Sequence, residues 1–169
     1  MAYPGPVVSV PWLEERLRDP AIRIVDATVH LPDTGRSARA EYLQGHISGA
    51  SFFDFDLVAD ASNPLPRKCP EAGVFADRVG ALGIGNDTHV IAYDTPGLYS
   101  AARVWWLFRH YGYDKVSILD GGLKAWCAAG LPVESGEVPV PRTEFHPGEE
   151  RGLLARWPRV LAAPRPRPP

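Results

Sequence analysis

The segment Val90-Ile91-Ala92-Tyr93-Asp94-Thr95-Pro96-Gly97-Leu98-Tyr99-Ser100 decides the fold and contains the candidate site. Its apolar run through Tyr93 predicts a buried strand, and Pro96-Gly97 predicts a turn. A helix is expected to follow over residues 100–111. In an open α/β sheet, ligands bind at such strand-to-helix loops, because unpaired amides and the helix dipole favour an anion or a thiolate there. The role of Asp94, the first residue of the loop, is therefore the central question.

Strands and helices are expected to alternate on both sides of this loop. Apolar, β-branched runs predict strands at residues 22–29, 50–55, 89–93 and 115–119. Apolar residues at helical spacing, together with terminating glycines, predict helices at residues 12–17, 41–44, 75–82, 100–111 and 123–129. The alternation predicts an α/β fold with a mostly parallel central sheet and helices on both faces.

Composition excludes several classes of protein. A chain of 169 residues suits one domain, and a net charge of -2 gives no reason to expect nucleic acid or a membrane as a partner. No apolar run approaches the roughly 20 residues that a membrane span needs. The two cysteines lack companions at ligand spacing, so no metal site is expected. The first residues lack the features of a signal peptide, and a cytoplasmic protein is predicted.

Two segments differ from the rest of the pattern. The expected helix at 100–111 is apolar on nearly every side, which predicts burial on several sides or a place at an interface. Residues 151–169 contain five arginines, five prolines and no acidic residue. Such a composition cannot extend a sheet, so residues 148–169 are expected to form a flexible tail, with a basic interaction motif as the alternative.

Several motifs resemble signatures of the rhodanese family. Residues 39–50 (RAEYLQGHISGA) resemble its first signature and residues 117–126 (SILDGGLKAW) its second. Residues 93–106 and the loop 64–70 (PLPRKCP) are similar to the amino-terminal half of the two-domain thiosulfate and 3-mercaptopyruvate sulfurtransferases, although Arg67-Lys68-Cys69 departs from the commoner residues of that loop. The resemblance implies a three-layer rhodanese-like domain over residues 7–147.

The resemblance also implies a reaction. Active rhodanese domains hold a cysteine where this chain has Asp94, and its thiolate accepts a sulfane sulfur to form a persulfide. A carboxylate cannot carry a persulfide, and the two-domain enzymes place their cysteine in the second half. The resemblance therefore implies a chain that is not catalytic alone, with a catalytic second rhodanese domain as partner, thiosulfate or 3-mercaptopyruvate as family substrates, and no cofactor. The degenerate loop comprises Asp94, Thr95, Pro96, Gly97, Leu98 and Tyr99.

Structural roles compete with functional ones at each candidate residue. Asp94 is expected to cap the amides of its turn rather than act as a catalyst. Arg103 and Arg67 are candidates for substrate binding or for structural ion pairs, with Asp94 or a neighbouring acid as the partner of Arg103. His46 is expected to fix its turn by a hydrogen bond rather than act as a general base. The Asp120-Gly121-Gly122 segment predicts a turn and a helix N-cap.

The two cysteines are given different roles. Cys69 lies beside Arg67 and Lys68, cations that would favour its thiolate, so it is a candidate sulfur acceptor. It lacks the helix-start position of the Asp94 loop. Cys127 lies among small apolar residues of a predicted helix and is expected to belong to the core.

Three functional hypotheses remain open at this stage. The first is the amino-terminal, non-catalytic half of a two-domain sulfurtransferase. The second is a stand-alone rhodanese module that binds a protein or an anion. The third is an independent enzyme that uses Cys69.

Overall fold

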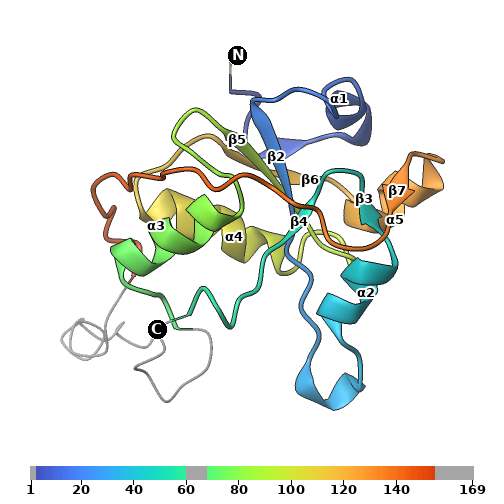
Figure 1. The fold of residues 1–169 in the computed structure, drawn as a ribbon, viewed down its shortest axis with the longest axis horizontal. Helices are drawn as coiled ribbons and strands as arrows, with labels where there is room; N and C mark the ends of the chain where they lie inside the picture. The colour runs from blue at the N-terminus through green and yellow to red at the C-terminus, as the bar shows by residue number, and fades with distance from the viewer. Residues whose placement is uncertain (1–2, 60–67, 155–169) are drawn as a thin grey trace, which may run out of the picture.

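A single parallel sheet forms the centre of the protein, as the computed structural model shows for residues 3–59 and 68–154 (Figure 1). Its five strands lie in the order β1-β6-β5-β2-β4, and all four pairings are parallel. The strands are β1 (Val7–Val8), β2 (Ile22–Asp26), β4 (Ser51–Phe52), β5 (His89–Tyr93) and β6 (Val116–Leu119). A separate antiparallel pair consists of β3 (His46–Ile47) and β7 (Val133–Glu134).

Helices cover both faces of the sheet. They are α1 (Val10–Glu14), the 3-10 helix η1 (Pro32–Thr34), α2 (Ala38–Gln44), α3 (Ala72–Ala81), α4 (Ala101–His110) and α5 (Gly122–Ala128). On one face, Val90 and Ala92 of β5 pack in the same core as α3 and α4. On the other, Ile91 and Tyr93 pack in the same core as α1 and α5. Alternate side chains of β5 thus point to opposite faces of the sheet, and both faces are buried under helices. This arrangement of a parallel sheet between two layers of helices confirms the predicted α/β class.

Several elements differ in extent from the prediction. The strand expected at 22–29 ends at Asp26, whose carboxylate accepts a 2.9 Å hydrogen bond from the amide of Thr28 and so turns the chain out of the ladder. The strand expected at 50–55 is limited to Ser51–Phe52. The first helix begins earlier, at Val10, because Ser9 caps it by accepting a hydrogen bond from the amide of Trp12.

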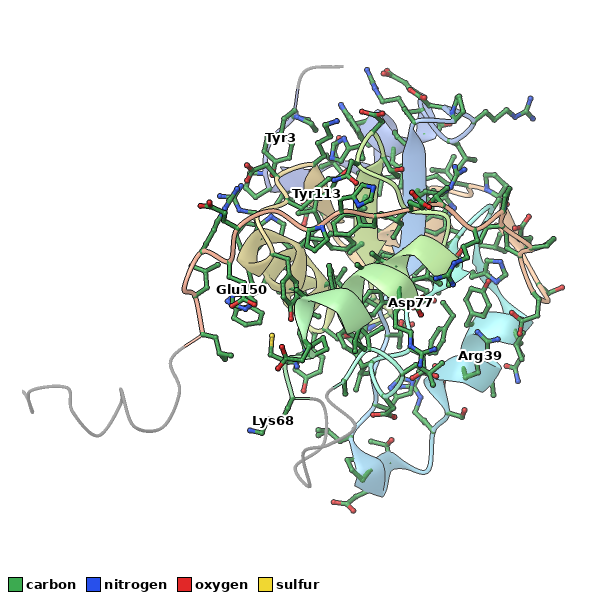
Figure 2. All side chains as sticks on the ribbon, turned by 60° about the vertical axis from the view of Figure 1, so that its left-hand side comes forward. Tyr3, Arg39, Lys68, Asp77, Tyr113 and Glu150 are labelled. Atoms are coloured by element: carbon green, nitrogen blue, oxygen red, sulfur yellow. The ribbon has the colours of Figure 1, made fainter. Side chains whose placement is uncertain are left out.

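Residues 135–151, which we call the strap, cross the molecule after β7 (the orange-to-red segment in Figure 1). Backbone hydrogen bonds of 2.9 Å join the strap to α2, α3 and the end of α4. Their donors are the amides of Gly136, Thr143, Gly148 and Arg151. Side chains add the pairs Asp77–Arg142 and Arg39–Glu137, whose helix residues are labelled in Figure 2. These contacts continue four residues past Pro147. Residues 155–169 of the expected tail lie outside the described chain.

One side-chain expectation is wrong. Cys127 is exposed rather than in the core. The preceding residue, Trp126, occupies the buried side of α5, and the helix turns the neighbouring Cys127 toward solvent. The Asp120-Gly121-Gly122 segment forms the predicted turn and contains the N-cap of α5, which is Gly121 and makes no side-chain hydrogen bond. The prediction that the apolar helix is buried on several sides agrees with the structure, because every residue of α4 is buried or partly buried. In the described residues, no helix is long and apolar enough to cross a membrane.

Candidate functional site

Asp94 stands at the carboxyl end of β5, where the chain enters the loop before α4. Its side chain is fully buried. One carboxylate oxygen accepts a hydrogen bond from the amide of Gly97 at 2.6 Å, and the other accepts from the amides of Tyr99 and Ala101 at 2.8 Å each. The hydroxyl of Ser100 lies 3.5 Å from the second oxygen. The expectation that Asp94 caps the amides of its turn is confirmed.

A second helix start holds the backbone of the same residue. The carbonyl of Asp94 accepts a 3.1 Å hydrogen bond from the amide of Leu123, at the beginning of α5. A Cβ on Gly122 would lie 2.1 Å from that carbonyl oxygen, so glycine is required for the approach. The beginnings of α4 and α5 therefore converge on one residue, α4 through the carboxylate and α5 through the carbonyl.

The apex of the loop projects from this anchor. Gly97 and Leu98 both have left-handed backbones, with φ of 85° and 66°. The side chains of Leu98 and Tyr99 are exposed. At the other end of the loop, the amide of Thr95 donates to the hydroxyl of Thr28 at 3.0 Å, which ties the loop to the end of β2.

Two adjoining cavities open at this edge of the sheet. The larger, of about 210 Å³, lies between the ends of β2 and β4 and the start of α2. The other, of about 200 Å³, is lined by Val29, Phe55, Tyr99, Ser100 and Arg103. Val29 and Phe55 line both cavities, which therefore adjoin each other, and we call the two cavities together the depression beside the Asp94 loop.

Arg103 lines this depression and does not pair with Asp94. Its guanidinium lies over the ring of Phe55, 6.0 Å from the centroid. The carboxylate of Asp94 is instead occupied by amides and Ser100, so the ion pair between these two described residues is not found. Arg67, the other candidate cation, lies outside the described residues. Whether either arginine binds a substrate stays a prediction.

A charged cluster that the sequence reasoning missed stands at the depression. Glu41 on α2 accepts hydrogen bonds from Arg36 at 2.7 and 2.8 Å, and its carboxylate lies 2.8 Å from Nε2 of His30. The bond from Arg36 holds the pKa of Glu41 below its usual value. Arg36 and His30 lie on the irregular segment between β2 and α2, where no periodic pattern could have marked them.

His46 is a structural residue, as expected. Its ring is fully buried and stacked on Tyr42 at 4.0 Å, and its Nδ1 lies 2.8 Å from the carbonyl of Tyr42. Its Nε2 lies 3.5 Å from the carboxylate of Glu134, which also accepts from the amide of Gly49. The hydrogen bond thus fixes the turn that leaves α2.

Asp26 lies in the interior close to this turn. Burial raises the pKa of Asp26, although hydrogen bonds from Thr28 oppose the shift. The hydroxyl of Tyr93, the residue before Asp94, also opposes this shift in the pKa of Asp26, and it accepts a 3.3 Å hydrogen bond from the amide of Ile47. The polar side chains beneath the Asp94 loop therefore serve mainly to hold the strand ends together.

Cys69 does not line the depression. It is partly buried, packs against the core beneath α3 and α4, and its sulfur lies 3.2 Å from the hydroxyl of Tyr111. Burial, followed by the contact with Cys69, raises the pKa of Tyr111. Neither Cys69 nor Cys127 forms a disulfide.

The fold and the loop define a class of protein. The family model described as a rhodanese-like domain matches residues 9–129, and the chain belongs to this family. The solved structure of SseA from Escherichia coli, described as a 3-mercaptopyruvate sulfotransferase, superposes with a TM-score of 0.86. That comparison has 40% identity and covers 92% of this chain and 60% of the other.

Within this family, the chain is similar to sulfurtransferases named for 3-mercaptopyruvate and thiosulfate. The chain is 44% identical to the 3-mercaptopyruvate sulfurtransferase of Rattus norvegicus over 145 residues, which are 82% of this chain and 49% of the relative. It is also 44% identical to the enzyme of that name from Escherichia coli K12, covering 82% of this chain and 50% of the relative. A mitochondrial thiosulfate/3-mercaptopyruvate sulfurtransferase of Arabidopsis thaliana is 48% identical, with 77% and 34% coverage. The chain thus spans half or less of the length of these relatives.

Proposed function

We propose that this chain is the non-catalytic rhodanese half of a sulfurtransferase that uses thiosulfate or 3-mercaptopyruvate. The supporting observation is the loop at Asp94. The amides that point into the loop are bonded to a carboxylate of the chain itself, which is fully buried. By family resemblance, a cysteine would stand at this position in an active domain.

The chemistry of sulfur transfer favours this proposal. The nucleophile must be a thiolate, because its sulfur forms a new S–S bond with the sulfur of the donor and keeps that sulfur on the enzyme as a persulfide, while sulfite leaves from thiosulfate or pyruvate leaves from 3-mercaptopyruvate. A carboxylate provides no sulfur, and the buried side chain of Asp94 has no free approach for a donor. Cys69 lies elsewhere, against Tyr111, and does not line the depression beside the loop.

In this proposal, the reacting cysteine belongs to a second rhodanese domain. The relatives are about twice as long as the matched part of this chain, which leaves room for such a domain. The depression at the carboxyl ends of β2, β4 and β5 is where a ligand of a parallel sheet is expected. We place the sulfur donor between this depression and the second domain.

Persulfide formation provides a direct test. The isolated chain is incubated with thiosulfate or with 3-mercaptopyruvate, and the mass of each cysteine-containing peptide is measured. We expect neither Cys69 nor Cys127 to gain a sulfur atom, whereas the Escherichia coli enzyme, run in parallel, does. A stoichiometric persulfide on Cys69 would overturn the proposal in favour of an independent enzyme.

We further propose a cytoplasmic location. Neither Cys69 nor Cys127 forms a disulfide, which suits a reducing compartment. The relative from Arabidopsis thaliana is named as mitochondrial, so the organelle is the natural alternative. Cell fractionation with an antibody against the chain distinguishes the two, and recovery with an organelle would contradict the proposal.

A further inference from the structure

A cavity of about 400 Å³ lies beneath the strap, at the outer edge of the sheet. β4 is the last strand on that side, and the strap passes it between α2 and α3, to which Gly136 and Thr143 are bonded (Figure 1). We call this space the strap cavity. It shares Arg39, Phe52 and Asp54 with the depression, but of these cavities only the strap cavity is lined by the strap and by the end of α3. Its volume is typical of a site for a small molecule.

One polar group in the wall of the strap cavity is left without a partner. Ser51 of β4 lines the cavity and is 5% exposed, and its hydroxyl oxygen has no hydrogen-bond partner in the described part of the chain. Native proteins pair nearly all of their buried polar groups, because burial takes a hydroxyl away from water and an unpaired one gains nothing in return. A polar ligand in the cavity would supply the missing hydrogen bond.

The charged side chains that line the strap cavity sum to one negative charge. Arg39 pairs with Glu137 of the strap. Its guanidinium also lies over the rings of Phe52 and Tyr42, at 5.2 and 5.5 Å from their centroids. The cation of the cavity is therefore already neutralised within the protein, and Asp54 is left as the unbalanced charge.

Asp54 holds its negative charge in a partly buried position. One of its carboxylate oxygens accepts hydrogen bonds from the amides of Asp56 and Leu57, at 2.9 and 3.4 Å. No cation among residues 3–59 and 68–154 forms an ion pair with it. The last residue of α3, Ala81, also lines the cavity, so the negative end of that helix dipole faces the same space. The strap cavity therefore favours a cation.

The remaining wall is apolar and includes Leu82 from the end of α3 and Val138 and Val140 from the strap. We propose that the strap cavity binds a small primary alkylamine as its ammonium ion. The carboxylate of Asp54 supplies the opposite charge, the hydroxyl of Ser51 accepts a hydrogen bond, and the apolar wall covers the carbon chain. This site needs no sulfur chemistry, so it is correct or wrong independently of the proposed function.

A series of matched probes tests the class of ligand on the full chain of 169 residues. n-Butylammonium, n-butanol, n-butyrate and ammonium are each titrated, and the backbone amide signals are followed by NMR. We expect n-butylammonium to shift the signals of Ser51, Leu82 and Val138 with a dissociation constant on the order of a millimolar. n-Butanol should bind at least about tenfold more weakly, and n-butyrate and ammonium should not saturate the site.

Two results with these probes would overturn the proposal. One is tighter binding of n-butyrate than of n-butylammonium. The other is a set of n-butylammonium shifts spread over the acidic surface instead of centred on the cavity. Nα-Acetyl-lysine methylamide carries the same ammonium group on a peptide backbone, and tighter binding of this probe than of n-butylammonium would overturn the assignment to a free small molecule.

Asp54→Asn tests the countercharge, with Asp19→Asn as the matched control. Asp19 accepts a 2.8 Å hydrogen bond from the amide of Ala21, two residues on, as Asp54 does from Asp56, but it lies before β2 at the opposite end of the sheet. Asparagine keeps the acceptor oxygen in both variants. We expect Asp54→Asn to weaken n-butylammonium binding at least about tenfold and Asp19→Asn to leave it unchanged. Equal effects of the two substitutions would contradict the proposal.

Ser51→Ala separates binding from support of the fold. We expect it to weaken n-butylammonium binding several-fold while the melting temperature of the unliganded chain stays the same or rises, because the variant removes an unpaired buried hydroxyl. A lower melting temperature with unchanged binding would show that Ser51 serves the fold alone, and would overturn its place in the site. If Asp54→Asn does not fold, the Ser51→Ala variant and the probe series decide the proposal.

Discussion

Asp94 is a buried carboxylate whose charge is matched chiefly by backbone amides. An ionised group without water is tolerated only when donors surround it, and here three amides do so at 2.6 to 2.8 Å. Arg103 lines the depression and forms no ion pair with Asp94. One residue therefore accounts for the shape of the loop and for the proposed lack of sulfur chemistry.

Replacing Asp94 should destabilise the domain in a graded way. We expect Asp94→Ala to lower the free energy of unfolding by about 3 kcal/mol, because buried amides lose their acceptor. Asp94→Asn keeps one acceptor oxygen and should cost about 1–2 kcal/mol. Urea unfolding followed by tryptophan fluorescence measures both. Equal stability for all three proteins would contradict the role given to the carboxylate.

The loop between β5 and α4 is held against the loop between β6 and α5. The carbonyl of Asp94 binds the start of α5, and Gly97 approaches the backbone of Gly121 so closely that a Cβ would lie 3.1 Å away. The helices on opposite faces of the sheet are thereby joined at its carboxyl edge. A small displacement at one helix start should be felt at the other.

Gly122→Ala tests this junction, with Gly130→Ala as the matched control. Both glycines have positive φ, of 56° and 70°, but a Cβ at Gly130 meets nothing within 4 Å whereas one at Gly122 meets the Asp94 carbonyl. We expect Gly130→Ala to cost about 1 kcal/mol, the penalty of the left-handed backbone. Gly122→Ala should cost at least about 2 kcal/mol more, as measured by thermal unfolding. Similar losses for the two variants would show that the approach is not tight.

The opposite edge of the sheet gives the whole molecule a pH dependence. His89, at the start of β5, lies against the rings of Tyr3 and Trp12, and its Nε2 is 2.9 Å from the hydroxyl of Ser117. That hydroxyl donates to the carbonyl of Gly5, so it accepts a hydrogen bond from the neutral histidine. Burial, followed by the charge of Lys115, lowers the pKa of His89 from 6.5 to about 4.

The lowered pKa of His89 makes the folded protein less stable at acidic pH. Between pH 6.5 and about 4 the unfolded chain binds a proton at His89 that the folded chain does not, so stability falls as the pH falls through this window. The loss has an upper limit of about 3.5 kcal/mol, because the pKa falls from 6.5 to about 4 and each tenfold change in proton affinity corresponds to about 1.4 kcal/mol. We expect His89→Asn to be less stable at pH 7 but to have a flatter profile over this range, as measured by urea unfolding at a series of pH values. A profile as steep as that of the unsubstituted chain would contradict the assignment.

The sequence predicted those features that depend on local periodicity. The bounds of β5 agree with the prediction, and the apolar surface of α4 correctly indicated a covered helix. The capping role of Asp94 could also be predicted, because a carboxylate at the start of a helix accepts hydrogen bonds from the unpaired amides of the first turn.

Features that depend on tertiary contacts could not be predicted. The strap has no periodicity, and its attachment relies on backbone bonds and on Phe145, which fills the core near Phe75 and Tyr113. The exposure of Cys127 is decided by the rotation of a short helix about Trp126. The left-handed backbone of Leu98 has no sequence signal, because glycine is the residue that usually marks such a position.

The measurement that tests the central claim most directly is the steady-state rate of sulfur transfer to cyanide by the isolated chain. Thiosulfate and 3-mercaptopyruvate are each tried as donor, with the Cys69→Ser/Cys127→Ser double variant and the Escherichia coli enzyme alongside. We predict no rate above the uncatalysed reaction for the chain or its variant. Substantial turnover, above all turnover that survives the loss of both cysteines, would contradict the account of a non-catalytic half.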